Sequence, residues 1–392
     1  MAIEGRADAR KGGRIRLGMV GGGEGAFIGA VHRIASRIDD QYELVAGALS
    51  STPEKSRRSG AALDLAPDRI YDDYESMAKA EAKRADGIEA VAIVTPNNVH
   101  AGPTYAFLKA GVHVICDKPL TVSLAEAKKM RAAVEKSGLV FALTHNYTGY
   151  PLVRRMREMV RAGELGDIRL VQAEYPQDWL TAATETSGNK QAEWRVDPKR
   201  SGAGGSLGDI GTHAYNLADY VSGLELAELA ADLTSFGAGR RLDDNAQIML
   251  RYANGARGAI WASQVAPGNE NGLMLRVYGT KGGFHWRQDN PNTLFWSPLE
   301  KSTRIVTRGG PDAGEAAGRV TRIPPGHPEG YLEGFANIYS EVALAIKAAR
   351  SGGKPPAEVN FPTIVDGVKG LAFIEAAVAS SKANGKWTAM DV

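Results

Sequence analysis

Short apolar runs alternate with amphipathic stretches from about residue 14 to residue 145. Each apolar run predicts a buried strand, and each amphipathic stretch predicts a helix. The predicted strands are 14–20, 42–49, a short one at 69–71, 89–95, 113–117 and 139–145. Apolar strands separated by helices are typical of a parallel sheet covered on both faces. This part of the chain therefore predicts an α/β domain with a doubly wound parallel sheet of six strands, whose nucleotide ligand lies beyond the carboxyl ends of the strands.

The pattern changes after Tyr147. A helix (151–162) and a strand (167–176) lead through a glycine-rich passage to another helix. Strands then follow one another closely before two final helices: 226–236, 243–252, 256–265, 272–279 and 283–286, then 329–350 and 364–383. This order predicts a second, α+β domain with a large, largely antiparallel open sheet. We divide the chain into a flexible tail (1–13), a dinucleotide-binding domain (14–146) and a substrate-binding and oligomerisation domain (147–392).

The second half also predicts a surface loop and an interface. The segment 300–327 is rich in Gly, Pro and Arg and predicts an exposed loop. An open antiparallel sheet has one face free to cover a partner, so we expect a homo-oligomer.

Composition narrows the class of protein. The 392 residues are 43% hydrophobic and 23% charged, as is usual for globular proteins. The net charge is +2 and basic residues are spread along the chain, which argues against a nucleic acid or a membrane as partner. No apolar run has the length of a transmembrane helix, and the charged N-terminus lacks the apolar core of a signal peptide. Cys116 is the only cysteine, which excludes a thiolate metal cluster and favours a reducing cytoplasm.

The first predicted strand runs into VGGGEGAFIGAVHR, a candidate phosphate-binding turn. Gly21 and Gly23 allow a tight turn and a close approach to a pyrophosphate, while the following helix offers free N–H groups. The spacing departs from G-x-G-x-x-G. If Gly29 is the third glycine, about three residues are inserted, which places Phe27 and Ile28 in the phosphate loop.

Further cofactor contacts are predicted at the ends of later strands. Ser50 and Ser51 stand where a carboxylate would hold the ribose hydroxyls, and no arginine stands beside them to bind a 2′-phosphate, which favours NAD over NADP. Arg57 and Arg58 could reach a 2′-phosphate, but they lie well into the next helix, where they can simply form a solvated face. The remaining predicted cofactor contacts follow strands 89–95 and 139–145 and comprise Thr95, Pro96, Asn97, His100 and Asn146.

Lys118 follows the strand 113–117 in the sequence Asp117-Lys118-Pro119. Proline fixes its own φ and biases the preceding residue towards extended geometry, so the backbone aims this lysine. Lys118 is therefore predicted to act at the edge of the sheet where the ligand binds.

A second cluster of candidate residues lies on the helix that starts at Leu207. Asp209 and His213 are four residues apart and share one face of this helix. A carboxylate there can orient an imidazole as a general base, or the two can form a merely structural contact. Two ligands without a third do not make a metal site, so we expect no metal.

The glycine turn, Asp-Lys-Pro and Asp-x-x-x-His together resemble the glucose–fructose oxidoreductase/inositol dehydrogenase (Gfo/Idh/MocA) family from Arg14 to about Trp387. The resemblance implies an N-terminal Rossmann domain, a C-terminal domain that often forms tetramers, and oxidation or reduction of sugars and cyclic polyols with NAD or NADP. It implies that Lys118 is the catalytic lysine, in a variant of the family's Glu-Lys-Pro, and that Asp209 and His213 are catalytic. The family often has Asn-Arg-Arg where this chain has Asn146-Tyr147-Thr148.

The resemblance implies oxidation of a secondary hydroxyl, most similar to the inositol and aldose dehydrogenase branch. His213, oriented by Asp209, would take the hydroxyl proton while Lys118 steadies the alkoxide and a hydride leaves for nicotinamide C4. Four residues could contact the substrate or simply pack: Tyr147, Trp179, Trp194 and Arg195. Two alternatives stay open, a sugar-sensing regulator without turnover and a glycosidase that recycles its NAD.

Overall fold

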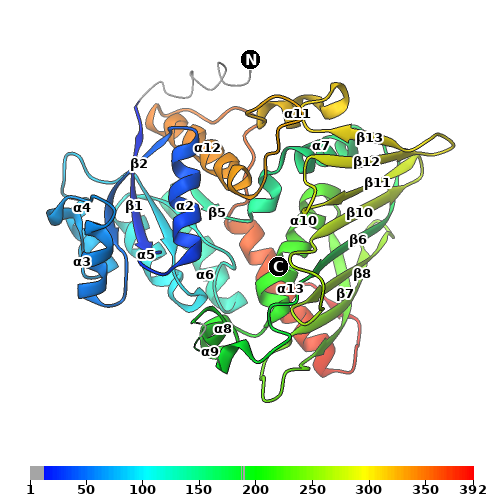
Figure 1. Ribbon diagram of the computed structural model, residues 1–392, viewed down its shortest axis with the longest axis horizontal. Coiled ribbons are helices and arrows are strands. Elements are labelled where there is room, and N and C mark those ends of the chain that lie inside the picture. The colour runs from blue at the N-terminus through cyan, green and yellow to red at the C-terminus, as the bar shows by residue number, and fades with distance from the viewer. Residues whose placement is uncertain (1–12, 187, 189) are drawn as a thin grey trace. The chain divides into compact units, whose positions relative to one another are not determined.

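The computed structural model describes residues 13–186, 188 and 190–392, and it divides into two compact units (Figure 1). Unit 1 runs to Thr121 and adds Ala125–Gly149 and Tyr331–Gly367. Unit 2 comprises Val122–Leu124, Tyr150–Gly330 and Val368–Val392. The division near residue 149 lies close to the predicted boundary. Residues 331–367, however, join unit 1 because helix α12 (Tyr331–Arg350) packs on its core.

Within the described residues, unit 1 contains five parallel strands in the order β2-β1-β3-β4-β5. They are β1 (Ile15–Gly21), β2 (Tyr42–Ala48), β3 (Ala90–Val94), β4 (His113–Cys116) and β5 (Phe141–Leu143). This confirms the predicted doubly wound sheet, but over the described residues it has five strands and not six, because the prediction of a strand at 69–71 is wrong. Pro67–Arg69 forms a 3₁₀ turn, and only Ile70 makes a single bridge to Gly47.

Helices cover both faces of this sheet. They are α2 (Phe27–Ile38), α3 (Pro53–Ala61), α4 (Tyr74–Glu81), α5 (Ala101–Lys109) and α6 (Leu124–Ser137), with α12 added from the C-terminal part of the chain. Helix α12 contributes Phe335, Tyr339 and Val342 to the same apolar cluster as Leu17 on β1 and Val31 on α2. The core of unit 1 is thus built from segments more than 300 residues apart.

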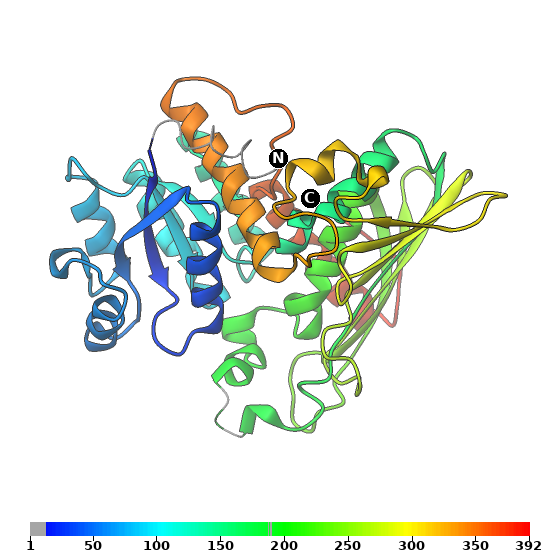
Figure 2. The same ribbon diagram turned by 45° about the horizontal axis from the view of Figure 1, so that its top comes forward.

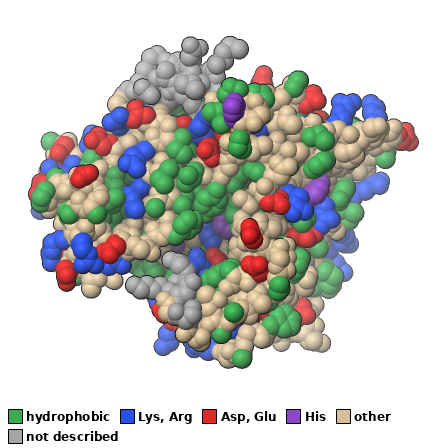
Figure 3. Space-filling model, viewed as in Figure 1, with side chains coloured by type: hydrophobic (Ala, Val, Ile, Leu, Met, Phe, Trp, Pro, Cys, Tyr) green, Lys and Arg blue, Asp and Glu red, His purple; other side chains and the backbone are tan. Residues whose placement is uncertain are grey.

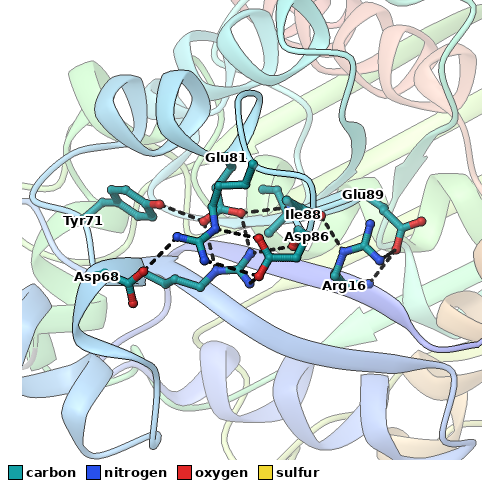
Figure 4. A network of polar contacts seen from close by, with 10 residues as sticks. Arg16, Asp68, Tyr71, Glu81, Asp86, Ile88 and Glu89 are labelled. Carbon is teal, nitrogen blue, oxygen red and sulfur yellow. Dashed lines mark hydrogen bonds and ion pairs between the residues drawn. The ribbon is translucent and has the colours of Figure 1, made fainter.

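A buried ion pair joins the turn Pro67–Arg69 to α4 before the start of β3 (Figure 4). Arg69 donates to both carboxylate oxygens of Glu81, whose side chain is fully buried. Glu81 also accepts hydrogen bonds from the Tyr71 hydroxyl (2.8 Å) and the Ile88 N–H (3.0 Å). With several donors, the carboxylate is well solvated by the protein, which a buried charge requires. The network therefore fixes the entry to β3, whose other end carries candidate site residues.

In the described part of the chain, unit 2 contains a nine-stranded sheet in the order β13-β12-β11-β10-β6-β9-β8-β7-β14. Neighbouring strands are antiparallel except β6 and β9, which confirms the predicted largely antiparallel sheet. The strands are β6 (Ile168–Pro176), β7 (Leu226–Thr234), β8 (Asn245–Tyr252), β9 (Arg257–Ser263), β10 (Met274–Gly279), β11 (Gly282–Arg287), β12 (Thr293–Pro298), β13 (Arg304–Thr307) and β14 (Thr388–Ala389). The predicted loop 300–327 is wrong in part, because it contains β13 and a short helix, α11 (Gly314–Arg319).

One face of this sheet is covered by helices and the other is open (Figure 2). The covering helices of unit 2 include α7 (Pro151–Arg161), α10 (Thr212–Ser222) and α13 (Ile364–Lys382). Large apolar side chains are exposed on strand positions that point away from these helices: Leu170, Met249, Tyr278, Phe295 and Ile305. Such a patch is typical of a protein–protein interface.

Charged side chains of both signs are interspersed on the face seen in Figure 3. This distribution agrees with the net charge of +2. Among the described helices, none has the length and apolar character needed to cross a membrane.

Candidate functional site

The glycine turn lies at the switch point of the unit 1 sheet, between β1 and β3. Gly21 has φ +76°, and a side chain there would lie 2.4 Å from the Val94 carbonyl oxygen of β3. A side chain at Gly29, on α2, would lie 2.2 Å from the Gly22 carbonyl oxygen. Gly29 therefore serves the close helix–strand packing that the third glycine of a nucleotide-binding turn serves.

Helix α2 begins directly after this turn. Its N-cap residue, Ala26, makes no side-chain cap to the first N–H groups, which suits a helix end that receives a phosphate. Phe27 is 68% exposed and Ile28 is half-buried. The predicted insertion thus lies at the start of the helix, where it can border a bound phosphate without filling the turn.

The end of β2 carries the two predicted serines. Ser50 is half-buried, with its hydroxyl 3.2 Å from that of Thr52, and Ser51 is exposed. The two arginines of α3 both form ion pairs. Arg57 lies 2.7 Å from Asp72, and Arg58 Nε donates to Glu24 of the glycine turn at 2.9 Å. A 2′-phosphate would have to compete with these carboxylates.

Two buried polar atoms at the carboxyl edge of the sheet have no hydrogen-bond partner among the described residues. They are Thr95 Oγ1, after β3, and Asn146 Nδ2, after β5. Pro96 is half-buried, and Asn97 is buried in the 3₁₀ turn Asn97–Val99. Unpaired buried donors and acceptors are rare unless a ligand satisfies them. With the glycine cradle, these atoms fit a dinucleotide such as NAD.

His100 is fully buried, and both of its ring nitrogens face backbone carbonyls. Nε2 lies 2.9 Å from the oxygen of Thr95, and Nδ1 lies 2.9 Å from that of Pro119. Burial lowers the pKa of His100, against the opposing charge of Asp117. The ring therefore connects the end of β3 to the segment that carries Lys118. Both ring nitrogens of His100 already face backbone oxygens, so its contact with the cofactor stays a prediction.

Lys118 is half-buried just after β4, between the strand ends that carry Thr95 and Asn146. Its backbone N–H donates to Asp117 Oδ1 (3.0 Å), which also accepts from the Thr144 hydroxyl (2.8 Å). Burial alone would raise the pKa of Asp117, but its interaction with His32, followed by the Lys118 charge, lowers it to about 2. Asp117 thus stays ionised and fixes the lysine backbone.

His145 lies near Lys118 and was not predicted as a site residue. It is 2% exposed, and burial, followed by the Lys118 charge, lowers its pKa to about 3. It therefore stays neutral at physiological pH. Tyr147 is also buried, with its ring centroid 6.4 Å from that of Tyr331 on α12.

In unit 2, Asp209 lies in a π-helical turn (Leu207–Gly211) that continues into α10. Asp209 Oδ2 accepts hydrogen bonds from Arg195 Nε (3.0 Å) and Gln264 Nε2 (2.9 Å). The turn lies beside β9, where a Cβ at Gly211 would stand 3.5 Å from that of Ala262, an ordinary packing distance. Gln264 follows that strand and so reaches the carboxylate. A π-turn in a helix often marks a functional site.

Arg195 is held between two tryptophans as well as by Asp209. Its guanidinium carbon lies 4.4 Å from the ring centroid of Trp194 and 5.9 Å from that of Trp179. The indole N–H of Trp179 donates to Gln177 Oε1 at 3.0 Å. The structure therefore brings two candidate substrate residues, Trp179 and Trp194, and the candidate catalytic Asp209 together around Arg195.

His213 is buried on α10, and its ring centroid lies 6.1 Å from that of Tyr175 on β6. Asp209 and His213 lie in one continuous helical segment, and the predicted orientation of the imidazole by the carboxylate stays a prediction. The hydroxyl of Tyr175 donates to Asn271 Oδ1 at 2.8 Å, so this aromatic neighbour is itself fixed. Each unit thus carries part of the predicted chemistry, Lys118 in unit 1 and the Asp209–His213 pair in unit 2.

Sequence reasoning missed His32, Thr144 and His145 in unit 1 and Tyr175 and Gln264 in unit 2. His32 stands inside the quoted glycine-turn motif, and His145 directly precedes Asn146, so their positions were visible although their contacts were not. Gln264 is 55 residues from Asp209, and no local pattern connects the two.

A parallel sheet with a glycine cradle at its switch point, followed by a lysine at a strand end, defines an NAD-binding oxidoreductase. Comparison with known proteins agrees. Residues 15–145 match the oxidoreductase family with an NAD-binding Rossmann fold, and residues 153–285 match the GFO/IDH/MocA C-terminal domain. The chain belongs to the Gfo/Idh/MocA family.

Three relatives illustrate the likeness. An oxidoreductase structure from Sinorhizobium meliloti is 58% identical, with a TM-score of 0.87, over 95% of this chain and 99% of that one. An inositol dehydrogenase homologue from Azotobacter vinelandii, solved with NAD⁺, is 36% identical with a TM-score of 0.93 over 96% and 97%. The same homologue was also solved with NADH and myo-inositol. Levoglucosan dehydrogenase of Pseudarthrobacter phenanthrenivorans is 27% identical over 95% of this chain and 97% of its own.

Replacing Gly29 with Ala should weaken NAD binding by about tenfold, because overpacking of this kind costs about 1–3 kcal/mol. The added methyl group would push α2 away from Gly22 and widen the turn. Titration of intrinsic fluorescence with NAD measures the change. Gly318→Ala, at a helical site with no atom within 4 Å, is the matched control and should bind NAD normally. Equal affinity in both variants would contradict the assigned role of Gly29.

Proposed function

We propose that this protein oxidises a secondary hydroxyl of a cyclic polyol or pyranose sugar, with NAD as the hydride acceptor. The observation that carries the proposal is the likeness, over nearly the whole chain, to a structure solved with NADH and myo-inositol, combined with Lys118, Asp209 and His213. Its relative that acts on levoglucosan supports a sugar ring as an equally suitable substrate. The proposed substrate class therefore rests on the likeness to these relatives and on the three side chains named above.

The chain's own residues supply binding and proton transfer. NAD, when bound, accepts a hydride at nicotinamide C4. The Lys118 amine holds the reacting hydroxyl and stabilises the negative charge that develops on its oxygen. His213 takes the hydroxyl proton, because a neutral imidazole is a suitable base near neutral pH. We propose that Lys118 and His213 act on the same hydroxyl during turnover.

Asp209 has a wider role in this proposal than orienting His213. It accepts from Arg195 and Gln264, so it also fixes the arginine between its two tryptophans. A carboxylate substrate is usually held by a bidentate arginine. The Arg195 charge is already offset by the Asp209 carboxylate, to which its Nε donates, and Tyr147 and Thr148 stand where the family often has arginine. An uncharged, hydroxyl-bearing ring therefore suits the site better than a hydroxy acid.

We further propose a homo-oligomer, a tetramer in line with the family resemblance, and a cytoplasmic location. The exposed apolar side chains on the open sheet face support an interface there. The only cysteine, Cys116, is buried and free, which suits a reducing compartment.

The test of substrate class is NADH absorbance across a panel of substrates. Myo-inositol, scyllo-inositol, free aldoses and levoglucosan should give NADH, whereas lactate, malate and gluconate should give little. A hydroxy acid that exceeds every cyclic substrate tenfold in kcat/KM, about 1.4 kcal/mol of transition-state preference, would contradict the proposal. Cleavage of a glycoside without net NADH would favour the glycosidase alternative, and ligand binding without turnover would favour the regulator.

Lys118→Ala should lower kcat by about 100-fold or more, because the amine stabilises charge only in the reacting state. NAD affinity should change little, since the glycine turn and the strand ends hold the dinucleotide elsewhere. Stopped-flow turnover and NAD titration separate the two effects. Lys109→Ala, an exposed lysine at the end of α5, is the control. Near-normal kcat in Lys118→Ala would show that the proposed site is wrong.

NAD should exceed NADP in kcat/KM by about tenfold or more, because the nearby arginines are paired with carboxylates. Glu24→Gln should narrow this ratio about threefold, because it removes the nearer of the two carboxylates paired with Arg58, an exposed pair worth about 0.5–1 kcal/mol, and leaves only Glu54 at 3.6 Å. Glu135→Gln, which breaks the surface pair with Arg131, should leave the ratio unchanged. A wild-type preference for NADP would overturn this prediction.

A further inference from the structure

A line of polar side chains crosses the apolar core of unit 1 and ends at Asp117. The Tyr339 hydroxyl, on α12, lies 2.8 Å from Nδ1 of His32, on α2. Nε2 of the same imidazole faces Asp117 Oδ1 at 3.8 Å, which is too long for a hydrogen bond but within the range of an electrostatic contact. Tyr339 and His32 are 1% and 0% exposed. Burying polar groups this deeply destabilises the fold unless they are hydrogen-bonded or paired with a charge.

The chemistry of the three groups assigns the protons along this line. Asp117 is ionised, so its carboxylate can only accept, and we assign His32 the tautomer whose proton is on the nitrogen that faces this carboxylate. His32 Nδ1 is then free to accept from the Tyr339 O–H. Burial, followed by the Asp117 charge, raises the pKa of Tyr339, so that hydroxyl keeps its proton. Tyrosine donates to imidazole, and imidazole presents its N–H to carboxylate.

The same carboxylate oxygen meets the candidate catalytic segment. Asp117 Oδ1 accepts the Lys118 backbone N–H and the Thr144 hydroxyl. Any shift of this oxygen therefore moves the backbone from which the Lys118 side chain extends. The ring of His32 is packed edge-on against Phe335, with 5.2 Å between centroids, so it has little freedom to move by itself.

We propose that His32, held by Tyr339, is a positioning residue that fixes the Asp117 carboxylate and, through it, the backbone of Lys118. The inference rests on the proposed role of Lys118. It goes beyond that role because it makes catalysis depend on α12, a helix from the C-terminal part of the chain. His32 itself touches neither substrate nor cofactor in this proposal.

The chain contains a matched control for this arrangement. Tyr42 is 2% exposed, its ring packs against Tyr339, and its hydroxyl donates to the Tyr339 backbone oxygen at 2.8 Å. Tyr42→Phe and Tyr339→Phe each remove one buried hydroxyl from the same cluster. Only Tyr339→Phe removes a hydrogen bond to His32. If the network is purely structural, the two substitutions should change kcat equally. If it positions Lys118, Tyr339→Phe should lower kcat and Tyr42→Phe should not.

The experiment measures kcat, the KM for NAD and thermal stability for both phenylalanine variants, with the substrate that gives most NADH. Tyr339→Phe should lower kcat about tenfold, as a small misplacement of a catalytic group can, while the KM for NAD stays within twofold. Tyr42→Phe should lose similar thermal stability with normal kcat. His32→Leu should lose more kcat than Tyr339→Phe. His32→Gln should recover most of it, because an amide can both donate to Asp117 and accept from Tyr339.

A second measurement does not need a substrate. Pyridoxal phosphate condenses with lysine amines to an imine with loss of water, and borohydride quenching reduces the imine to a stable amine. Peptide mass spectrometry then follows the labelling rate of Lys118 in the NAD-bound protein. Tyr339→Phe should change that rate more than threefold and Tyr42→Phe should not. If no polyol is oxidised but this difference is found, the proposed substrate fails and the positioning role stands. Equal labelling rates and equal kcat in the two phenylalanine variants would overturn the positioning role.

Discussion

The candidate site of unit 1 depends on the contacts of one carboxylate, that of Asp117. One carboxylate oxygen contacts the Lys118 backbone, the Thr144 hydroxyl and the His32 ring, which come from three different segments. Aspartate is one methylene shorter than the glutamate that the family usually has here. Its oxygen therefore lies closer to its own main chain, where it can accept the following N–H. The substitution is conservative in charge but ties the lysine more directly to its own strand end.

His100 also holds the segment that carries Lys118, through the end of β3. Its contacts with the carbonyls of Thr95 and Pro119 connect the ends of β3 and β4, while Asp117 connects β4 to β5. Parallel strands bring their carboxyl ends to one edge, but they leave the loops beyond that edge without ladder hydrogen bonds. Buried side-chain contacts supply the missing constraints, so a lysine in a loop acquires the rigidity of the sheet.

The sequence predicted elements well wherever the signal was local. Continuous apolar runs identified the five parallel strands, and Asp-Lys-Pro and Asp-x-x-x-His identified candidate residues that the structure places at a strand end and on a helix. Local signals failed at 69–71, where Pro67 begins a 3₁₀ turn, and at 304–307, where a strand forms by pairing with β12. The contacts of Asp209 with Arg195 and Gln264, and of His32 with Tyr339, join residues far apart in sequence, so periodicity and spacing could not reveal them.

Helix α12 also affects the order of events during synthesis. It supplies Phe335, Ile338 and Val342 to the core of unit 1, yet a ribosome releases residues 13–149 long before it reaches that helix. At about 5–20 residues per second, roughly 10–40 s separate the two segments. During that time the apolar side of α2 that later receives α12 is uncovered. The nucleotide-binding unit is thus translated first but can complete its core only near the end of translation.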